Sequence, residues 1–242
     1  MIPIRDLNPT RSTPWVTWTL VLVCVLVFVW QAVLPPGSER DFIYGYGLVP
    51  QRVSTRLEAE TLVTVLTSMF MHGGFMHAAG NLWFLHIFGD NVEDNMGPAR
   101  FAVFYLLCGV AAAVTQVAVN PASTVPMVGA SGAIAGVLAA YLVLYAGARV
   151  VTLIPIFIFL HWTELPAWVF IALWFVMQFF NGVGSLAHGG AGGGVAYWAH
   201  IGGFVAGLAL VFVFRSPRPP TPRIQWQPPM RGRAPWQQSR GW

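Results

Sequence analysis

Residues 129–136 read Gly-Ala-Ser-Gly-Ala-Ile-Ala-Gly, a run of small side chains with a single hydroxyl group. A serine surrounded by hydrocarbon needs a reason, so we interpret Ser131 as a candidate nucleophile at the start of a helix. Ser131 and Ala135 would share one helical face, with Gly132 and Gly136 beside them. The G-x-x-x-G spacing predicts that a second helix packs closely against this one.

A second stretch has the same glycine spacing and carries a histidine. Residues 199–207 read Ala-His-Ile-Gly-Gly-Phe-Val-Ala-Gly, which places His200, Gly203 and Gly207 on one helical face. Histidine is the commonest base for activating a hydroxyl nucleophile. We therefore predict a hydrogen bond between Ser131 and His200. Taken alone, each motif also fits an N-cap serine or ordinary glycine-mediated packing.

The composition predicts a polytopic membrane protein. Of 242 residues, 56% are hydrophobic and 9% are charged, and the mean hydropathy is +0.61. These values lie outside the range of soluble domains. Cys24 and Cys108 fall inside apolar runs, which favours packing roles over a disulfide or a metal site. We expect no cofactor, no metal and no nucleic-acid partner.

Six apolar runs predict an all-α bundle of six membrane-spanning helices, since a crossing needs about 20 apolar residues. The predicted spans are residues 14–34, 76–88 with a possible continuation to 91, 100–119, 131–147, 166–180 and 197–214. A polar turn is expected at residues 90–95. Residues 38–75 mix charges with apolar runs and predict short amphipathic helices in the membrane interface. Residues 150–162 are interpreted as an apolar connection interrupted by Pro155.

Two further segments are predicted to lack regular structure. Residues 181–196 hold seven glycines and predict a mobile loop. Residues 215–242 hold six arginines and seven prolines and predict a disordered, basic, proline-rich tail. This tail would either fix the topology or bind anionic lipid headgroups.

The arginines predict the orientation. Six crossings place both termini on one side, which would carry four arginines before the tail and the six in it, ten in all, against three opposite. The positive-inside rule makes that side cytoplasmic, including the N-terminal residues 1–13. Ser131 and His200 then lie at the outer ends of their spans. We expect a bacterial inner-membrane protein whose site opens to the extracytoplasmic side.

A third motif precedes the second predicted span. Residues 72–81 read His-Gly-Gly-Phe-Met-His-Ala-Ala-Gly-Asn, so His77 and Asn81 lie one helical turn apart. Two inward-facing donors at that depth could stabilise an oxyanion, or they could simply hydrogen-bond to each other across the turn. We expect His72 to order the preceding loop.

With these three motifs, the chain resembles the rhomboid family of intramembrane serine proteases over roughly residues 40–212. The resemblance implies a six-helix protease domain over residues 14–214 that cleaves membrane-anchored substrates near a transmembrane segment, with the bilayer as its surroundings. It implies a catalytic dyad of Ser131 and His200. It also implies an oxyanion hole formed by His77, Asn81 and the Ser131 backbone amide. We expect His72, Gly129 and Gly132 to have loop-ordering or supporting roles.

One position departs from the family pattern. Many members have an aromatic residue four positions after the serine, stacked on the catalytic histidine, whereas this chain has Ala135. The support for the His200 ring must therefore differ. The acids predicted on the outer side all lie within residues 38–75, which favours a dyad over a triad. Water would reach the site through a polar cavity covered by the glycine-rich loop.

Three alternative functions agree less well with the sequence than a protease does. A catalytically inactive rhomboid-like protein would share the fold and bind membrane clients, but it would not need both Ser131 and His200. A transporter would typically show internal repeats and charges at mid-membrane, and neither is evident. A metalloprotease is disfavoured because no H-E-x-x-H motif occurs.

Overall fold

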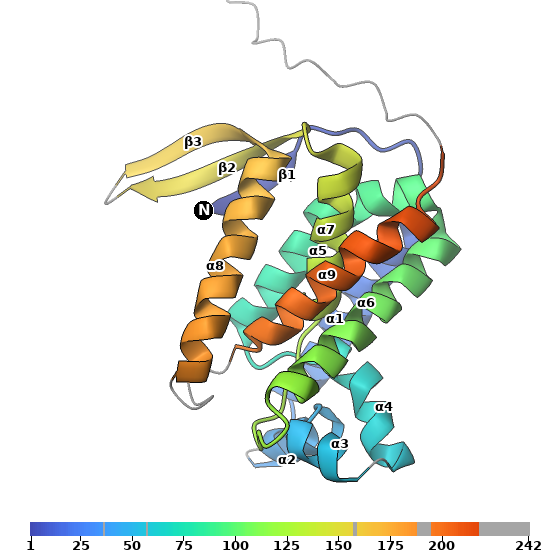
Figure 1. The fold of residues 1–242 in the computed structure, drawn as a ribbon, viewed down its shortest axis with the longest axis vertical. Helices are drawn as coiled ribbons and strands as arrows, with labels where there is room; N and C mark the ends of the chain where they lie inside the picture. The colour runs from blue at the N-terminus through green and yellow to red at the C-terminus, as the bar shows by residue number, and fades with distance from the viewer. Residues whose placement is uncertain (36, 57, 157–158, 188–194, 218–242) are drawn as a thin grey trace, which may run out of the picture.

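The computed structural model describes every residue except 36, 57, 157–158, 188–194 and 218–242. The described part is mostly helical and is built around a bundle of long helices (Figure 1). These are α1 (Trp15–Ala32), α5 (Phe75–Met96), α6 (Pro98–Val119), α7 (Ser131–Tyr145), α8 (Ala167–Ala187) and α9 (Tyr197–Phe214). Helix α7 is central because its small residues let α5, α6 and α9 pack against it.

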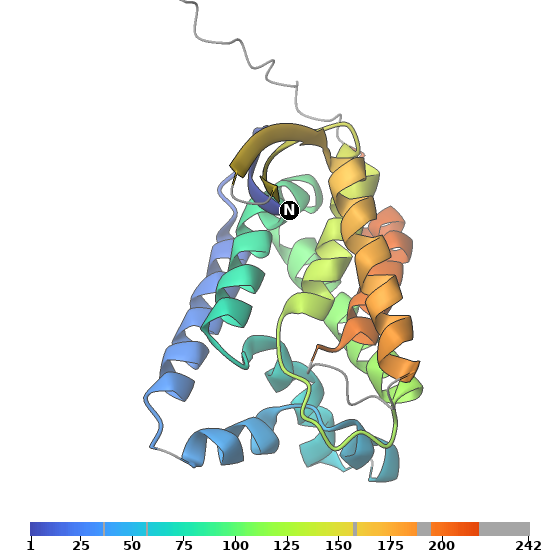
Figure 2. The same cartoon turned by 90° about the vertical axis from the view of Figure 1, so that its left-hand side faces the viewer.

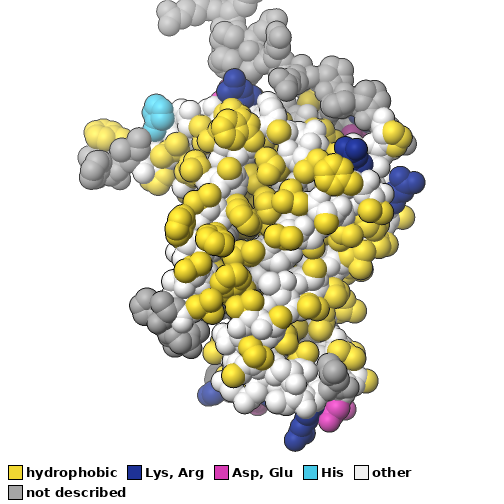
Figure 3. Space-filling model, viewed as in Figure 1, with side chains coloured by type: hydrophobic (Ala, Val, Ile, Leu, Met, Phe, Trp, Pro, Cys, Tyr) yellow, Lys and Arg dark blue, Asp and Glu magenta, His cyan; other side chains and the backbone are white. Residues whose placement is uncertain are grey.

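Four of the described helices are long and apolar enough to cross a membrane, namely α1, α6, α8 and α9. Helix α7 has only 15 residues, and α5 carries polar side chains at both of its ends. Hydrophobic side chains cover the face formed by α6, α8 and α9, whereas the charged side chains lie towards its two ends (Figure 3). The chain is therefore an integral membrane protein. The count of six crossings remains a prediction.

Helix α5 is longer than predicted. The expected polar turn at residues 90–95 is wrong, because the helix continues to Met96 and ends at Gly97, whose φ is +82°. The polar side chains in this stretch are paired inside the protein. The Glu93 carboxylate accepts hydrogen bonds from the backbone N–H groups of Val16 and Thr17 at 2.9 and 2.7 Å. Glu93 thereby satisfies the first turn of α1 from a neighbouring helix.

The fold is not all-α, because residues predicted as an apolar connection form a β-hairpin. Strand β2 (Arg149–Ile156) pairs with β3 (Phe159–Pro166) and with the N-terminal strand β1 (Ile2–Asp6) in an antiparallel sheet of order β1-β2-β3. The sheet lies where α7 ends and α8 begins (Figure 1). The pattern of apolar residues at 150–162 did not by itself predict strands. One reason is that β1, one of the two partners of β2, lies far away in the sequence, at the N-terminal end of the described chain.

The opposite end of the bundle holds the short helices α2 (Ser38–Tyr46), α3 (Pro50–Thr55) and α4 (Ala59–Thr67) and the 3-10 turn η1 (Ser68–Phe70) (Figures 1 and 2). Short helices were predicted in this segment, and their place in the membrane interface remains a prediction. Backbone bonds tie the segment to the linker before α7. The N–H of Gly129 donates to the Ser68 carbonyl at 2.9 Å, and Leu48 pairs with Met127.

Helix α8 also exceeds its predicted length. It continues beyond residue 180 to Ala187, so the expected loop over residues 181–196 is helical in its first part. Most of the remainder, residues 188–194, lies outside the described residues. The predicted disordered tail also lies outside them from residue 218 onward.

Candidate active site

Helices α7 and α9 are in backbone contact through glycines. A Cβ atom placed on Gly203 would lie 1.9 Å from the carbonyl oxygen of Gly132. One placed on Gly207 would lie 2.4 Å from the carbonyl oxygen of Gly136. No side chain fits at such distances, so the close packing predicted from the G-x-x-x-G spacings depends on glycine at these positions.

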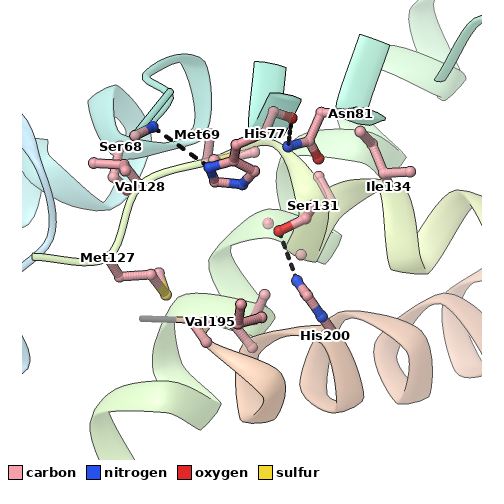
Figure 4. Close-up of a pocket in the computed structure, with 18 of the residues that line it drawn as sticks. Ser68, Met69, His77, Asn81, Met127, Val128, Ser131, Ile134, Val195 and His200 are labelled. Atoms are coloured by element: carbon pink, nitrogen blue, oxygen red, sulfur yellow. Dashed lines mark hydrogen bonds between the residues drawn. The ribbon is translucent and has the colours of Figure 1, made fainter. Parts of the chain in front are cut away.

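This contact brings the serine and the histidine together. Ser131 is the first residue of α7, and His200 lies in the first turn of α9. The Oγ atom of Ser131 lies 2.7 Å from Nε2 of His200, a hydrogen-bonding distance (Figure 4). Ser131 is half-buried, and His200 is only 9% exposed. The arrangement has the nucleophile-to-base geometry required for acyl transfer.

The opposite edge of the His200 ring contacts α8. This contact was not predicted from the sequence. The Nδ1 atom of His200 lies 2.8 Å from Oε1 of Gln178. The ring of Trp174, one turn earlier on α8, lies 5.9 Å from the His200 ring at an angle of 36°. Gln178 could have been noticed in the sequence, because an unpaired amide within a predicted membrane span is costly and must find a hydrogen-bonding partner.

His77 lies against the backbone that precedes Ser131. A Cβ atom on Gly129 would lie 2.8 Å from both Cε1 and Nε2 of His77 and 3.7 Å from the Ser131 hydroxyl oxygen. Gly129 also has a φ of +128°. This position therefore requires glycine for two reasons, namely the positive φ and the lack of space for a Cβ atom beside His77. The Nδ1 atom of His77 accepts a hydrogen bond from the N–H of Gly73 at 3.4 Å. A neutral ring in this state carries its hydrogen on Nε2, beside Gly129.

Asn81 lies one turn further along α5 and is 7% exposed. Its Nδ2 atom donates to the backbone carbonyl of His77 at 2.9 Å, so the two residues are linked through the backbone rather than through both side chains (Figure 4). The amide nitrogen has two hydrogens and this bond uses one. Asn81 also lines the same cavity as Ser131 and His200.

His72 holds the loop between η1 and α5 instead of facing the serine. Gln31 of α1 bonds to its backbone twice, accepting from the His72 N–H at 3.1 Å and donating to the His72 carbonyl at 3.1 Å. The His72 ring is 1% exposed and lies edge-on to the His77 ring, with centroids 5.3 Å apart. Burial, together with the neighbouring His77, lowers the pKa of His72 to about 4. The role of Gln31 was not anticipated from the sequence.

These side chains converge on one cavity of about 670 Å³. Ser131, His200, His77 and Asn81 line its polar wall (Figure 4), together with Ser68 and Gln178. Its apolar wall comes from several elements and includes Met76, Phe84, Met127, Val128, Ile134, Trp174 and Val195. An apolar cavity with a few convergent polar groups is the usual form of a ligand-binding site.

Comparisons with known proteins agree on one family. A sequence model described as Rhomboid domain matches residues 59–217. RHOMBOID-like protein 5 of Arabidopsis thaliana is 28% identical over 236 residues, which cover 85% of this chain and 70% of that protein. Putative rhomboid protease YdcA of Bacillus subtilis is 33% identical over 136 residues, or 54% of this chain and 63% of that protein.

A further relative is named as an inactive rhomboid protein. Inactive rhomboid protein 1 of Drosophila melanogaster is 30% identical over 131 residues, which cover 53% of this chain. The match covers only 8% of the fly protein, and the match to RHOMBOID-like protein 1 of Arabidopsis thaliana covers 46% of that protein. The chain thus spans less than half the length of these two relatives, and the relatives include proteases and an inactive member.

Proposed function

Because the chain belongs to the rhomboid family, we propose that it is an intramembrane serine protease that hydrolyses peptide bonds in or near the transmembrane segments of other membrane proteins. The observation that carries this proposal is the 2.7 Å contact between the Ser131 hydroxyl and Nε2 of His200. A hydroxyl is a weak nucleophile until a base removes its proton, and this contact supplies the base.

The reaction proceeds by acyl transfer in two halves. His200 takes the proton of Ser131 as Oγ attacks the substrate carbonyl carbon, and the carbonyl oxygen becomes an oxyanion. His200 then gives that proton to the leaving amine as the peptide bond breaks. In the second half, His200 deprotonates a water molecule that attacks the acyl-serine, and the proton returns to Ser131 as the ester bond breaks.

Three donors serve the oxyanion. The backbone N–H of Ser131 lies at the start of α7, where helical N–H groups have no partner within the helix. The Nε2 hydrogen of His77 lies beside Gly129, and the second amide hydrogen of Asn81 is available at the cavity wall. Donors preorganised around developing negative charge usually give the largest single contribution to such a reaction.

Hydrolysis within a bilayer needs a route for water and a route for substrate. His77, Ser131 and His200 lie near the starts of α5, α7 and α9, which face the end of the bundle that holds α2, α3 and α4 (Figure 1). The arginine distribution makes that side extracytoplasmic and puts both termini in the cytoplasm. Reporter fusions at Arg215 should therefore read as cytoplasmic and a tag in α3 should react from outside. The reverse pattern would overturn the orientation.

A catalytically inactive client-binding protein is the second candidate, favoured by the match to Inactive rhomboid protein 1. Both candidates would bind membrane segments in the cavity. They differ in whether a covalent acyl-serine forms, which requires the Ser131–His200 contact to work as a nucleophile and base.

The deciding experiment incubates the purified full-length chain with a panel of single-span model substrates. We expect new fragments, labelling of Ser131 by a serine-directed mechanism-based reagent, and no effect of chelators. Client binding without cleavage and without Ser131 labelling would support the inactive alternative. Inactivation by a chelator that added metal reverses would refute the serine mechanism.

A further inference from the structure

The geometry points to Gln178 of α8 as a positioning residue that sets the tautomer and orientation of His200. The inference rests on the proposed function, in which His200 is the base. Gln178 Oε1 lies 2.8 Å from Nδ1 of His200, on the opposite edge of the ring from Ser131 Oγ, which lies 2.7 Å from Nε2. The imidazole is thus held between two helices, one bond from each.

Because His200 is buried, its two hydrogen bonds determine how the ring is oriented. His200 and Gln178 are each 9% exposed, so bulk water is not a ready substitute for either partner. A buried amide without a partner is costly, and so is a buried imidazole. Each side chain therefore satisfies the other at the place where the base must be held still.

The hydrogen bond to Gln178 selects one tautomer of the neutral His200 imidazole. The ring carries one hydrogen, on Nδ1 or on Nε2. A carbonyl oxygen facing Nδ1 keeps the hydrogen there, which leaves the Nε2 lone pair to accept the proton of Ser131. The opposite tautomer would place a hydrogen on Nε2 and could not take a proton from Ser131. A neutral amide can fill this third position, as it does in Cys-His-Asn proteases.

The same bond is useful after proton transfer. When His200 holds the serine proton, both ring nitrogens are donors and the ring is positively charged. Gln178 Oε1 continues to accept from Nδ1, and the negative end of its carbonyl dipole faces the new charge. An amide does this less strongly than a carboxylate, because it carries no net charge.

Trp174 shows that α8 supports the ring on its face as well as its edge. Trp174 and Gln178 are four residues apart on α8 and share one helical face. The Trp174 ring lies 5.9 Å from that of His200. The position on α7 that could have carried an aromatic residue is Ala135, which is fully buried and reaches no further than its methyl group. Helix α8, and not α7, thus orients the base.

The test compares two replacements of Gln178 of similar length in the full-length protein. Gln178→Met keeps the volume but removes the strong acceptor, whereas Gln178→Glu keeps an acceptor facing Nδ1. We expect Gln178→Met to lower turnover about 10²-fold with substrate affinity unchanged, because only base function is lost. Gln178→Glu should retain more turnover than Gln178→Met. It should also move the acidic limb of the pH–rate profile to higher pH, because an adjacent carboxylate stabilises the imidazolium.

The matched control is Gln116→Met on α6, which is partly buried and is outside the set of residues that line the cavity. It should leave turnover and the pH profile unchanged. Equal turnover in the Met and Glu variants at position 178 would overturn the inference, since packing alone would then explain it. Should Gln178→Met fail to fold in a thermal melt, the Glu variant decides, and an unshifted acidic limb would overturn the inference.

Failure of this inference can be told apart from failure of the proposed function. Each variant is assayed alongside its Ser131→Ala counterpart. Cleavage that persists without Ser131 would refute the serine protease itself. Cleavage that requires Ser131 but is indifferent to the residue at position 178 would refute only the role of Gln178.

Discussion

The bundle carries polar side chains at both of its ends, and the two ends use them differently. At the cavity end, Ser131, His200, His77 and Asn81 line a cavity of about 670 Å³. At the sheet end, beside β1, polar groups bond to one another and to the backbone. Glu93, Tyr141 and Asp6 do so there, and they are outside the set of residues that line the cavity. Buried polarity therefore marks a site of chemistry only where it faces a cavity.

The sheet end shows what structural polarity looks like in this bundle. The Glu93 carboxylate, 2% exposed, bonds to two backbone N–H groups and the hydroxyl of Thr17. The Tyr141 hydroxyl donates to the Asp6 carboxylate at 2.6 Å, and that of Tyr145 donates to the Asn91 carbonyl at 3.2 Å. These bonds join α1, α5, α7 and β1. We therefore expect changes here to alter stability, and changes at the cavity end to alter turnover.

The largest expected effect is at the nucleophile and the base. Ser131→Ala and His200→Ala should each abolish detectable cleavage, because no other group in the mechanism can form the acyl intermediate or move its proton. Membrane insertion of both variants and the thermal melt of Ser131→Ala in detergent should stay close to those of the unmodified protein, whereas His200→Ala leaves the buried amide of Gln178 without its partner and should melt at a lower temperature. The matched control is Ser185→Ala on α8, whose hydroxyl donates to the Gly182 carbonyl one turn earlier on the same helix. Cleavage by purified Ser131→Ala would contradict the dyad.

The next largest effect is at the oxyanion donors. His77→Ala and Asn81→Ala each leave two other donors, so turnover should fall by about 10² to 10³ while slow, Ser131-dependent cleavage remains. Apparent substrate affinity should change less than turnover, because the contact forms mainly in the transition state. His72→Ala should instead lower the melting temperature. Wild-type turnover in both His77→Ala and Asn81→Ala would make this face of α5 structural only.

A third substitution, Gly203→Ala, should lower both stability and turnover, although it lies at the cavity end. Gly203→Ala places a Cβ atom 1.9 Å from the Gly132 carbonyl oxygen, so α7 and α9 must separate. Overpacking of this kind typically costs about 1 to 3 kcal/mol, and separation lengthens the Ser131–His200 bond. Both the melting temperature and turnover should therefore fall. Gly45→Ala on α2 is the control, because its added Cβ would have no atom of the described residues within 4 Å. If turnover survived in Gly203→Ala, the glycine contact would not set the dyad geometry.

The sheet end is tested by Glu93→Ala, which should lower stability and spare catalysis. It removes the acceptor of the Val16 and Thr17 N–H groups, and each buried group left unpaired costs about 1 to 3 kcal/mol. Turnover per folded molecule should not change. The control is Glu60→Ala on α4, where the side chain is exposed. Loss of turnover without loss of stability would show that the two ends are not independent.

Asp6 should make the stability of the protein depend on pH. Burial and the nearby Asp90 carboxylate, opposed by the Tyr141 hydrogen bond, raise the pKa of Asp6 from 3.8 to about 7. The folded protein thus binds a proton more tightly than the unfolded chain, so stability is highest below about pH 4 and falls as the pH rises to about 7. Asp6→Asn should flatten this part of the curve of melting temperature against pH. An unchanged slope in Asp6→Asn would assign the dependence to other groups.

Several features of this fold follow from local sequence signals. Runs of apolar residues predicted the long helices, because helical hydrogen bonds are satisfied within the segment and need no partner. The glycine spacings predicted that α7 and α9 would touch, since only a side-chain hydrogen allows backbones so close. The predicted topology, in which both helices begin on the same side of the membrane, placed Ser131 and His200 at matching depth. These inferences needed no knowledge of which other helices surround the pair.

The sequence by itself thus determined the helices, the α7–α9 contact and the pair of Ser131 and His200. Only the tertiary structure decided what surrounds them: Gln178 and Trp174 against His200, the α1 cap by Glu93 and the strand pairing of β1 with β2. Such contacts depend on the rotation and neighbours of each element, which no local pattern encodes. A buried polar side chain must find some partner, but its own sequence does not say which one.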